Sequence, residues 1–279
     1  MSKIQVRTTL IYEVRQPTNF LFNIGVEQSD YQRCLEEHFT SNPEVPIEAC
    51  NVGAEGNRLH RAFVQPCELR IDYSALVELT PEVDTSCEVG ETDISQLPPQ
   101  VLPYLNPSRY CESDLLARFA FEEFGQLPRG YQRVQAIADW VNDHLDYEPG
   151  TTSGTTTAAD VLLQRAGVCR DYAHLAVALC RGIGVPARYL AAYAVDLQPP
   201  DFHGVFEAFL DGHWYLFDAT RLAPVQGFVR IGTGRDAADV AFATLNGVAI
   251  LQEKTVTTVW ADDAPHQDPP PADEAIATA

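Results

Sequence analysis

The sequence has no run of eighteen apolar residues, the length that a membrane-spanning helix requires. Its opening stretch, MSKIQVRTTLIYEVRQ, holds no apolar block followed by a small-residue cleavage site, so we interpret it as the start of a strand and not as a signal peptide. Basic residues are scarce, because 19 Lys and Arg stand against 39 Asp and Glu and give a net charge of -20. This charge argues against nucleic acid and anionic membrane surfaces as partners. We expect a cytoplasmic protein.

Metal-binding patterns are also missing. The sequence contains no CxxC pair, no HExxH and no acidic loop of the EF-hand type, so we expect neither a metal site nor a bound cofactor. The odd number of cysteines, with no secretory signal, argues against a disulfide framework. Most of the thiols are expected to be small buried hydrophobic residues. The cysteines are Cys34, Cys50, Cys67, Cys87, Cys111, Cys169 and Cys180.

Hydrophobic patterning divides the chain into three parts. Residues 1–103 carry β-branched runs such as IQVRTTLIYEV, which predict an N-terminal β-sandwich of antiparallel strands. Residues 104–260 switch to helical periodicity near the proline-dense segment QLPPQVLPYLNP, so the expected fold class is α+β. Residues 261–279 are acidic and proline-rich with almost no large apolar side chains, which predicts a disordered tail.

Cys169 stands where a helix is expected to begin. The run CRDYAHLAVALCRGIGVP predicts a buried central helix from near Cys169 to Gly184, with Pro186 beyond it as a stop signal. A thiol at a helix N-terminus faces unpaired backbone N–H groups and the positive end of the dipole, and both favour the nucleophilic thiolate. The N–H of Cys169 is also suited to donate to a developing oxyanion. Position alone would still favour a packed core cysteine, which is what we expect of Cys180.

The segment DFHGVFEAFLDGHWYLFDAT predicts a hairpin that brings a histidine and a carboxylate together. Asp211-Gly212, between two aromatic and β-branched runs, is a strong hairpin signal. With an even-length turn there, His203 and Asp218 fall on one face as diagonal neighbours within side-chain reach. An odd-length loop would destroy the pairing, and the rival base, His213, lies at the turn on the opposite face. Taken singly, the two residues would be an exposed loop histidine and a strand-end aspartate. With the helix-terminal cysteine they complete a nucleophile, a base and an orienting group.

Three blocks of the sequence resemble the bacterial transglutaminase-like family. They are GVCRDYAHLAVALCRGIGVPARY, DFHGVFEAFLDGHWYLFDAT and GTGRDAADVAF. The likeness covers about residues 104–260, and the β-rich front resembles the N-terminal domain often found with this core. It implies a papain-like core in which a cysteine-bearing helix packs on an antiparallel sheet. It also implies Cys169 as nucleophile, His203 as general base and acid, and Asp218 as the orienting group. One departure is Val205, where the family commonly has tryptophan, and it concerns the substrate-binding surface near the histidine.

Two further groups of residues leave alternatives open. Arg235, Asp236 and Asp239 in the third block either line the cleft or form an Arg–Asp network that pins a loop, and we favour the network. A second oxyanion donor is not marked by any motif. Tyr147 and the TTSGTTT loop, residues 151–157, are the candidates.

These residues together predict acyl transfer through a thioester, with an amide bond of a peptide or protein as the substrate. Water as the final acceptor would make the chain a protease or amidase, and a second amine would make it a transglutaminase. We favour the protease or amidase. The alternative is a catalytically silent binding or scaffold module that keeps the three residues without using them.

Overall fold

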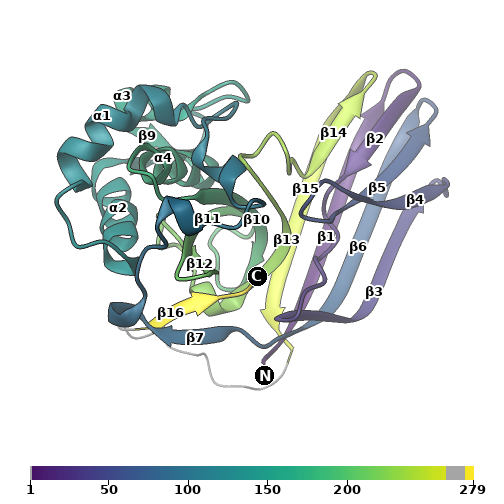
Figure 1. Ribbon diagram of the computed structural model, residues 1–279. Coiled ribbons are helices and arrows are strands. Elements are labelled where there is room, and N and C mark those ends of the chain that lie inside the picture. The colour runs from purple at the N-terminus through teal and green to yellow at the C-terminus, as the bar shows by residue number, and fades with distance from the viewer. Residues whose placement is uncertain (1, 262–273) are drawn as a thin grey trace.

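The computed structural model describes residues 2–261 and 274–279, and its elements form an α+β protein, as the sequence predicts (Figure 1). Helices lie on one side, a six-stranded sheet lies in the middle, and two four-stranded sheets form the other side. The middle sheet packs directly against the sandwich, because Tyr193, Val229 and Ile231 share one hydrophobic core with sandwich side chains. Within the described residues, no helix is long and apolar enough to cross a membrane.

The N-terminal residues form a β-sandwich because buried and more exposed positions alternate along their strands. In β6, for example, Leu69, Ile71 and Tyr73 are buried, whereas the residues between them are less so. One sheet has the order β15-β1-β6-β3, and the other has the order β14-β2-β5-β4. Their strands are β1 (Ser2–Val14), β2 (Thr18–Phe22), β3 (Gln32–Asn42), β4 (Ile47–Val52), β5 (Asn57–Val64), β6 (Cys67–Leu79), β14 (Ala243–Asn246) and β15 (Ala249–Trp260).

The middle sheet has the strand order β13-β10-β11-β12-β16-β7, and neighbouring strands run antiparallel. Its strands are β7 (Glu82–Thr85), β10 (Ala187–Ala194), β11 (Phe202–Leu210), β12 (His213–Phe217), β13 (Phe228–Gly234) and β16 (Glu274–Ala277). A separate parallel pair consists of β8 (Asp146–Tyr147) and β9 (Ala166–Gly167).

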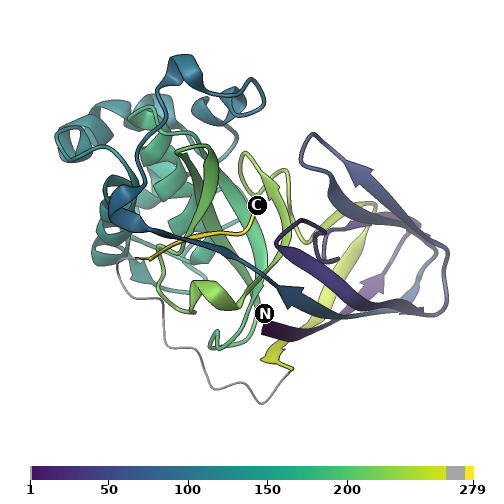
Figure 2. The same cartoon turned by 60° about the horizontal axis from the view of Figure 1, so that its bottom comes forward.

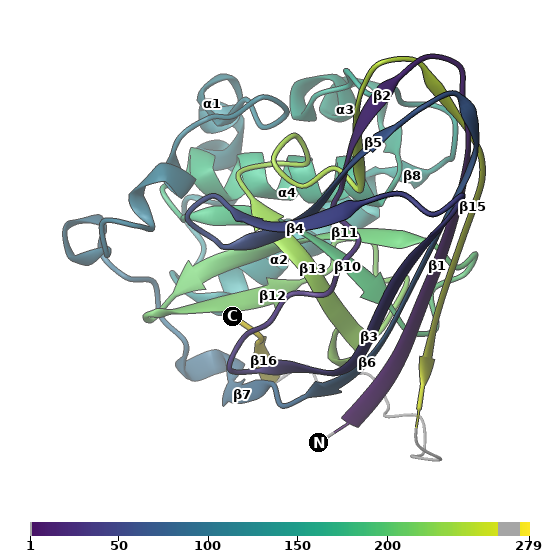
Figure 3. The ribbon, with the colours of Figure 1, turned by 90° about the vertical axis from the view of Figure 1, so that its right-hand side faces the viewer.

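The helices cover the face of the middle sheet that points away from the sandwich. Helix α4 lies against β10 and β11, and the other three α-helices pack around it (Figure 3). The α-helices are α1 (Ser113–Phe124), α2 (Tyr131–His144), α3 (Ala158–Gln164) and α4 (Cys169–Gly182). Short 3-10 helices span Ser86–Glu88, Ile94–Gln96, Leu102–Leu105 and Val225–Gly227.

The sheets divide the chain differently from the predicted boundaries. We expected residues 104–260 to form the second domain, but β14 pairs with β2 and β15 pairs with β1, so both strands complete the sandwich. Conversely, β7 leaves the N-terminal part and joins the edge of the middle sheet (Figure 2). A period-two pattern identifies a strand, but it does not say which sheet edge that strand joins.

The end of the chain also differs from the prediction of a disordered tail over residues 261–279. Residues 262–273 lie outside the described part. Residues 274–277, however, form β16, which lies between β12 and β7 and has its last three residues buried. The proline-rich, acidic composition of the whole segment concealed the short run AIATA, whose small side chains suit a strand packed between two others.

Glu207 on β11 ties the middle sheet to the sandwich through two arginines. Its fully buried carboxylate accepts hydrogen bonds from Arg230 and, at 2.7 Å, from Nε of Arg188. Arg188 also reaches Glu55 of the sandwich at 2.6 Å, and Arg230 reaches Glu27 at 3.0 Å. Buried charges are tolerated only when they are paired and hydrogen-bonded, so this network fixes how the two halves meet.

Replacement of Glu207 by Ala is expected to lower the free energy of unfolding by about 3 kcal/mol, because it leaves two buried guanidinium groups without their shared partner. Urea unfolding of the variant measures the change. The matched control is Glu122→Ala, which breaks an exposed ion pair with Arg118 on α1 and should change the free energy by less than about 0.5 kcal/mol. Equal effects of the two substitutions would contradict a structural role for the buried network.

Candidate active site

Helix α4 begins at Cys169, where the sequence predicts, and Asp171 caps one backbone group at its N-terminus. The carboxylate of Asp171 is buried and accepts the backbone N–H of Val168 at 3.0 Å, which satisfies one of the free donors at this end. The rest of α4 is buried almost all round, so the helix cannot shift. The thiol of Cys169 therefore lies in a fixed place in the first helical turn, next to the positive end of the helix dipole.

The hairpin of β11 and β12 has the predicted register. Leu210 pairs with His213 and Phe206 pairs with Phe217 across a two-residue turn. The turn residues Asp211 and Gly212 have φ values of 44° and 89°, the left-handed conformation that the right-handed twist of a tight hairpin requires. This even-length turn keeps His203 and Asp218 on the same face of the hairpin, as the sequence predicts.

His203 and Asp218 meet across this hairpin. Nε2 of His203 lies 3.0 Å from Oδ2 of Asp218, and both side chains are almost fully buried. The other carboxylate oxygen, Oδ1, accepts the backbone N–H of Thr220 at 2.8 Å and its hydroxyl at 2.7 Å. These bonds hold the carboxylate in place, and the carboxylate in turn orients the imidazole ring so that Nδ1 is left for another partner.

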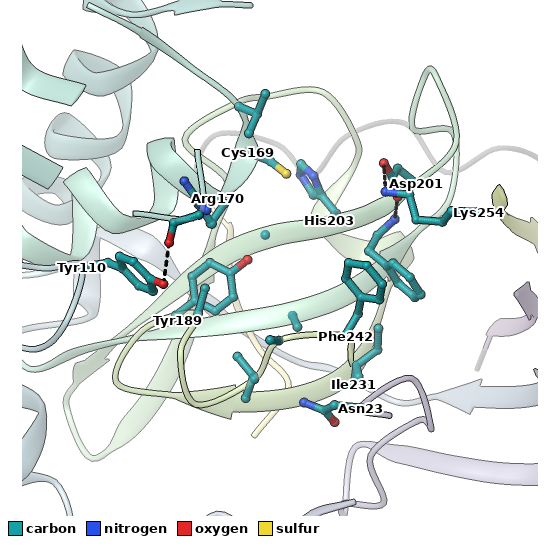
Figure 4. Close-up of a pocket in the computed structure, with 18 residues that line it drawn as sticks. Asn23, Tyr110, Cys169, Arg170, Tyr189, Asp201, His203, Ile231, Phe242 and Lys254 are labelled. Atoms are coloured by element: carbon teal, nitrogen blue, oxygen red, sulfur yellow. Dashed lines mark hydrogen bonds and ion pairs between the residues drawn. The ribbon is translucent and has the colours of Figure 1, made fainter. Parts of the chain in front are cut away.

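The thiol of Cys169 points at the imidazole of His203 (Figure 4). Burial by itself raises the pKa of Cys169, but the neighbouring imidazole of His203 outweighs this effect, so the pKa is lowered. Burial by itself lowers the pKa of His203, but Asp218 and Cys169 together raise it above its ordinary value. The two shifts favour a thiolate–imidazolium pair around neutral pH. The structure thus brings the three predicted residues together in an arrangement able to supply a nucleophile and a proton carrier.

A pocket of about 440 Å³ opens beside Cys169 and His203 (Figure 4). Gly204 forms part of its wall, and a Cβ at that position would lie only 2.3 Å from the hydroxyl of Tyr189. Glycine is therefore needed for this close approach. Residues far away in the sequence complete the wall, among them Asn23 and Lys254 from the sandwich part of the chain.

Gly154 of the TTSGTTT loop also lines this pocket, whereas Arg235, Asp236, Asp239 and His213 lie outside it. Arg235 pairs with Asp239, and the carboxylate of Asp236 accepts the backbone N–H of Tyr110 at 2.9 Å. They form the loop-pinning network favoured from the sequence. His213 lies at the hairpin turn, 3.7 Å from Glu82.

The loop next to this network forms a wall of the pocket. Ala237, Val240 and Phe242 line the pocket, and the loop is anchored to α4 because Nε2 of the buried His174 accepts the N–H of Ala237 at 3.1 Å. Burial lowers the pKa of His174 to about 3, so its ring stays neutral and remains able to accept this bond. No sequence pattern singled out His174, because a lone histidine in an apolar helix is more often a satisfied core residue.

Tyr147, one of the candidates for a second oxyanion donor, lies beside Cys169. Burial raises the pKa of its phenol, and the neighbouring Cys169 raises it further, so the hydroxyl keeps its proton. Tyr147 belongs to β8, which pairs with β9 just before α4, and this pairing brings the tyrosine to the start of the helix. Within residues 2–261 and 274–279, no three His, Cys, Asp or Glu side chains gather as a metal site would require.

Comparison with known proteins places the chain in a family. Residues 119–219 match the Transglutaminase-like superfamily, and residues 2–100 match the Bacterial transglutaminase, N-terminal domain. The crystal structure of a candidate cysteine protease from Cytophaga hutchinsonii is 37% identical to this chain, with a TM-score of 0.94 over 100% of this chain and 98% of that one. The chain therefore belongs to the transglutaminase-like superfamily, whose fold and site support a cysteine-dependent, enzyme-like function.

Two mycobacterial relatives match over shorter stretches. An uncharacterised protein of Mycobacterium leprae is 35% identical over 117 residues, which cover 39% of this chain and 42% of that protein. An uncharacterised protein of Mycobacterium tuberculosis is 29% identical over 181 residues, which cover 58% of this chain and 56% of that protein. The match thus spans about half the length of these curated relatives.

Alkylation by iodoacetamide should be faster at Cys169 than at the exposed Cys87 by about tenfold at pH 6, because the lowered pKa keeps Cys169 ionised below the ordinary thiol range. In His203→Ala, the midpoint of the rate–pH curve for Cys169 should move to higher pH, since the group that stabilises the thiolate is gone. Site-resolved peptide mass spectrometry measures both rates in one sample. An unchanged midpoint in His203→Ala would show that His203 does not activate the thiol.

Proposed function

We propose that this chain is a cysteine-dependent enzyme that breaks amide bonds of peptides or proteins through a thioester on Cys169. The observation that supports this most strongly is the meeting of three groups from two separate segments. A thiol at a capped helix start faces an imidazole whose far nitrogen is held by a buried carboxylate. A purely structural histidine in this position would not need an orienting aspartate and a neighbouring thiol together.

The proposed reaction begins with the thiolate of Cys169 attacking the amide carbonyl carbon. A carbon–sulfur bond forms, and the carbonyl electrons move to the oxygen. As this oxyanion collapses, the carbon–nitrogen bond breaks and the leaving amine takes the proton from the imidazolium of His203. His203 then draws a proton from the incoming water, which attacks the thioester; the second oxyanion collapses, the carbon–sulfur bond breaks, the carboxylic acid product leaves, and the thiolate–imidazolium pair is restored. Asp218 holds the ring in place through both steps.

The oxyanion is proposed to form next to the backbone N–H of Cys169 and the hydroxyl of Tyr147. A helix N-terminus presents unpaired N–H groups to this position, and a phenol that keeps its proton can donate one further hydrogen bond. The two donors come from neighbouring elements, since β8 and the start of α4 are joined through β9.

Water is the proposed final acceptor, which makes the chain a protease or amidase in preference to a transglutaminase. The relative from Cytophaga hutchinsonii, described as a candidate cysteine protease, supports this choice by analogy. The apolar pocket beside the thiol is of a size to receive a substrate side chain.

Hydrolysis of a p-nitrophenyl ester, a generic acyl donor, is expected to disappear in Cys169→Ala and to fall by about a thousandfold or more in His203→Ala. An Asp218→Asn variant should lose activity as well, because the imidazole loses its orienting charge. His213→Ala is the matched control, since His213 is exposed at the turn and should leave the rate unchanged. Intact-protein mass spectrometry should detect the acyl group on the wild-type protein. Equal rates in wild type and Cys169→Ala would instead favour a silent binding or scaffold module.

Substitution of Tyr147 by Phe is expected to lower kcat for the same ester by about tenfold to a hundredfold, because one oxyanion donor is lost. The KM should change little, since the hydroxyl acts on the charge that develops during the reaction. The rate of Cys169 alkylation should stay within about twofold of wild type, and this control separates oxyanion stabilisation from thiol activation. An unchanged kcat would exclude Tyr147 as the donor.

A further inference from the structure

The sandwich part of the chain lines the far end of the pocket beside Cys169. Asn23, which follows β2, lies at the end of the pocket away from the cysteine (Figure 4). Its backbone N–H donates to the carbonyl of Phe242 at 2.9 Å, and Phe242 lines the same pocket. The asparagine is therefore held firmly in the wall, with its side chain at the pocket end.

The side chain of Asn23 is buried and has no partner. Only 1% of the residue is exposed, and neither Nδ2 nor Oδ1 forms a hydrogen bond within the described part of the chain. Buried amides are nearly always paired, because an unpaired one loses its bonds to water without compensation. A donor and an acceptor left unpaired together in the wall of a pocket point to a ligand group that supplies the complementary pair.

A neighbouring asparagine provides the contrast. Asn57 is also buried, and its amide forms two hydrogen bonds with the backbone of Thr233, at 2.6 and 2.9 Å. Both asparagines approach Gly232 on β13, so they belong to the same contact between the sandwich and the middle sheet. Asn57 holds the two halves together by hydrogen bonds, whereas the side chain of Asn23 forms no hydrogen bond across that contact.

The remaining walls of the pocket favour a neutral group. Its charged side chains already have partners, because Arg170 is bonded to Asp171 at 2.7 Å and Lys254 is bonded to Asp201 at 2.6 Å. Much of the rest is apolar, including Ala191, Ile231, Val240 and Phe242. A charged substrate side chain would lose its hydration here without gaining an opposite charge. A carboxamide carries no charge and offers one acceptor and two donors, which match the free atoms of Asn23.

We propose that this pocket is a subsite for a carboxamide side chain, an asparagine or glutamine of the substrate next to the bond that is cleaved, and that Asn23 determines this specificity. The inference rests on the proposed cysteine-dependent function. The carboxamide recognised at Asn23 is not the group attacked, because Cys169 lies at the opposite end of the pocket. The sandwich thereby takes part in selecting the substrate.

The test uses acetylated tripeptide chloromethyl ketones that differ in one residue, at the position next to the ketone or one before it. Glutamine, asparagine, leucine, glutamate and lysine are compared, and modification of Cys169 in the full chain is followed by mass spectrometry. In wild type, the best carboxamide reagent should react about tenfold faster than its leucine and glutamate counterparts, because leucine leaves Asn23 unpaired and glutamate adds a buried charge.

In Asn23→Leu, which keeps the side-chain shape, this preference should fall to about onefold while the iodoacetamide rate stays at the wild-type value. Asn19→Leu, an exposed asparagine of β2, is the matched control and should keep the full preference. Loss of a buried unpaired amide should not lower the melting temperature, so the variant is expected to fold.

The two proposals fail in different ways. If iodoacetamide does not distinguish Cys169 from the other thiols, the cysteine-dependent function itself is wrong. If Cys169 is activated but wild type shows no carboxamide preference, the proposal of a carboxamide subsite is overturned. The wild-type protein alone is enough to show this result. A preference that survives Asn23→Leu would equally overturn the role of Asn23.

Discussion

The register of the β11–β12 hairpin is the constraint on which the rest of the site depends. A slip of one residue between the two strands would turn Asp218 to the opposite face and leave the imidazole of His203 without its carboxylate. The turn opposes this slip because Asp211 and Gly212 both take the left-handed conformation that is typical of a tight two-residue connection. Buried aromatic pairs farther along the hairpin, such as Phe206 with Phe217, hold the same alignment by packing.

A network of buried charges connects this hairpin to the sandwich. Glu207 lies four residues after His203 on the same strand, and its two arginines reach acidic side chains of the other half. The strand that carries the imidazole is therefore clamped from the side opposite α4. Because the pocket takes its walls from both halves, the position of the sandwich decides the shape of the space in front of the thiol.

Local signals in the sequence were sufficient to predict where the three central residues lie. The position of each depends on its neighbours in the chain: Cys169 on the start of a helix, and His203 and Asp218 on a tight turn. Partners distant in the chain were not predictable. Strands β14 and β15 were assigned with the rest of residues 104–260 to the second domain, although they complete the sandwich, and the composition of the C-terminal segment hid β16. Asn23 carried no signal at all, since a single asparagine after a strand is an ordinary turn residue until the fold brings it to the pocket.

The exchange of strands between the two halves has a consequence for how the protein is made. Ile4 in the first strand pairs with Trp260 near the end of the described chain, so β1 leaves the ribosome long before β15 exists. The sandwich cannot complete its sheets before β14 and β15 have been translated, and one long edge of β1 stays open until then. Non-local pairings of this kind slow folding and expose edges to other chains. Maturation of the site therefore waits until β15 has been translated.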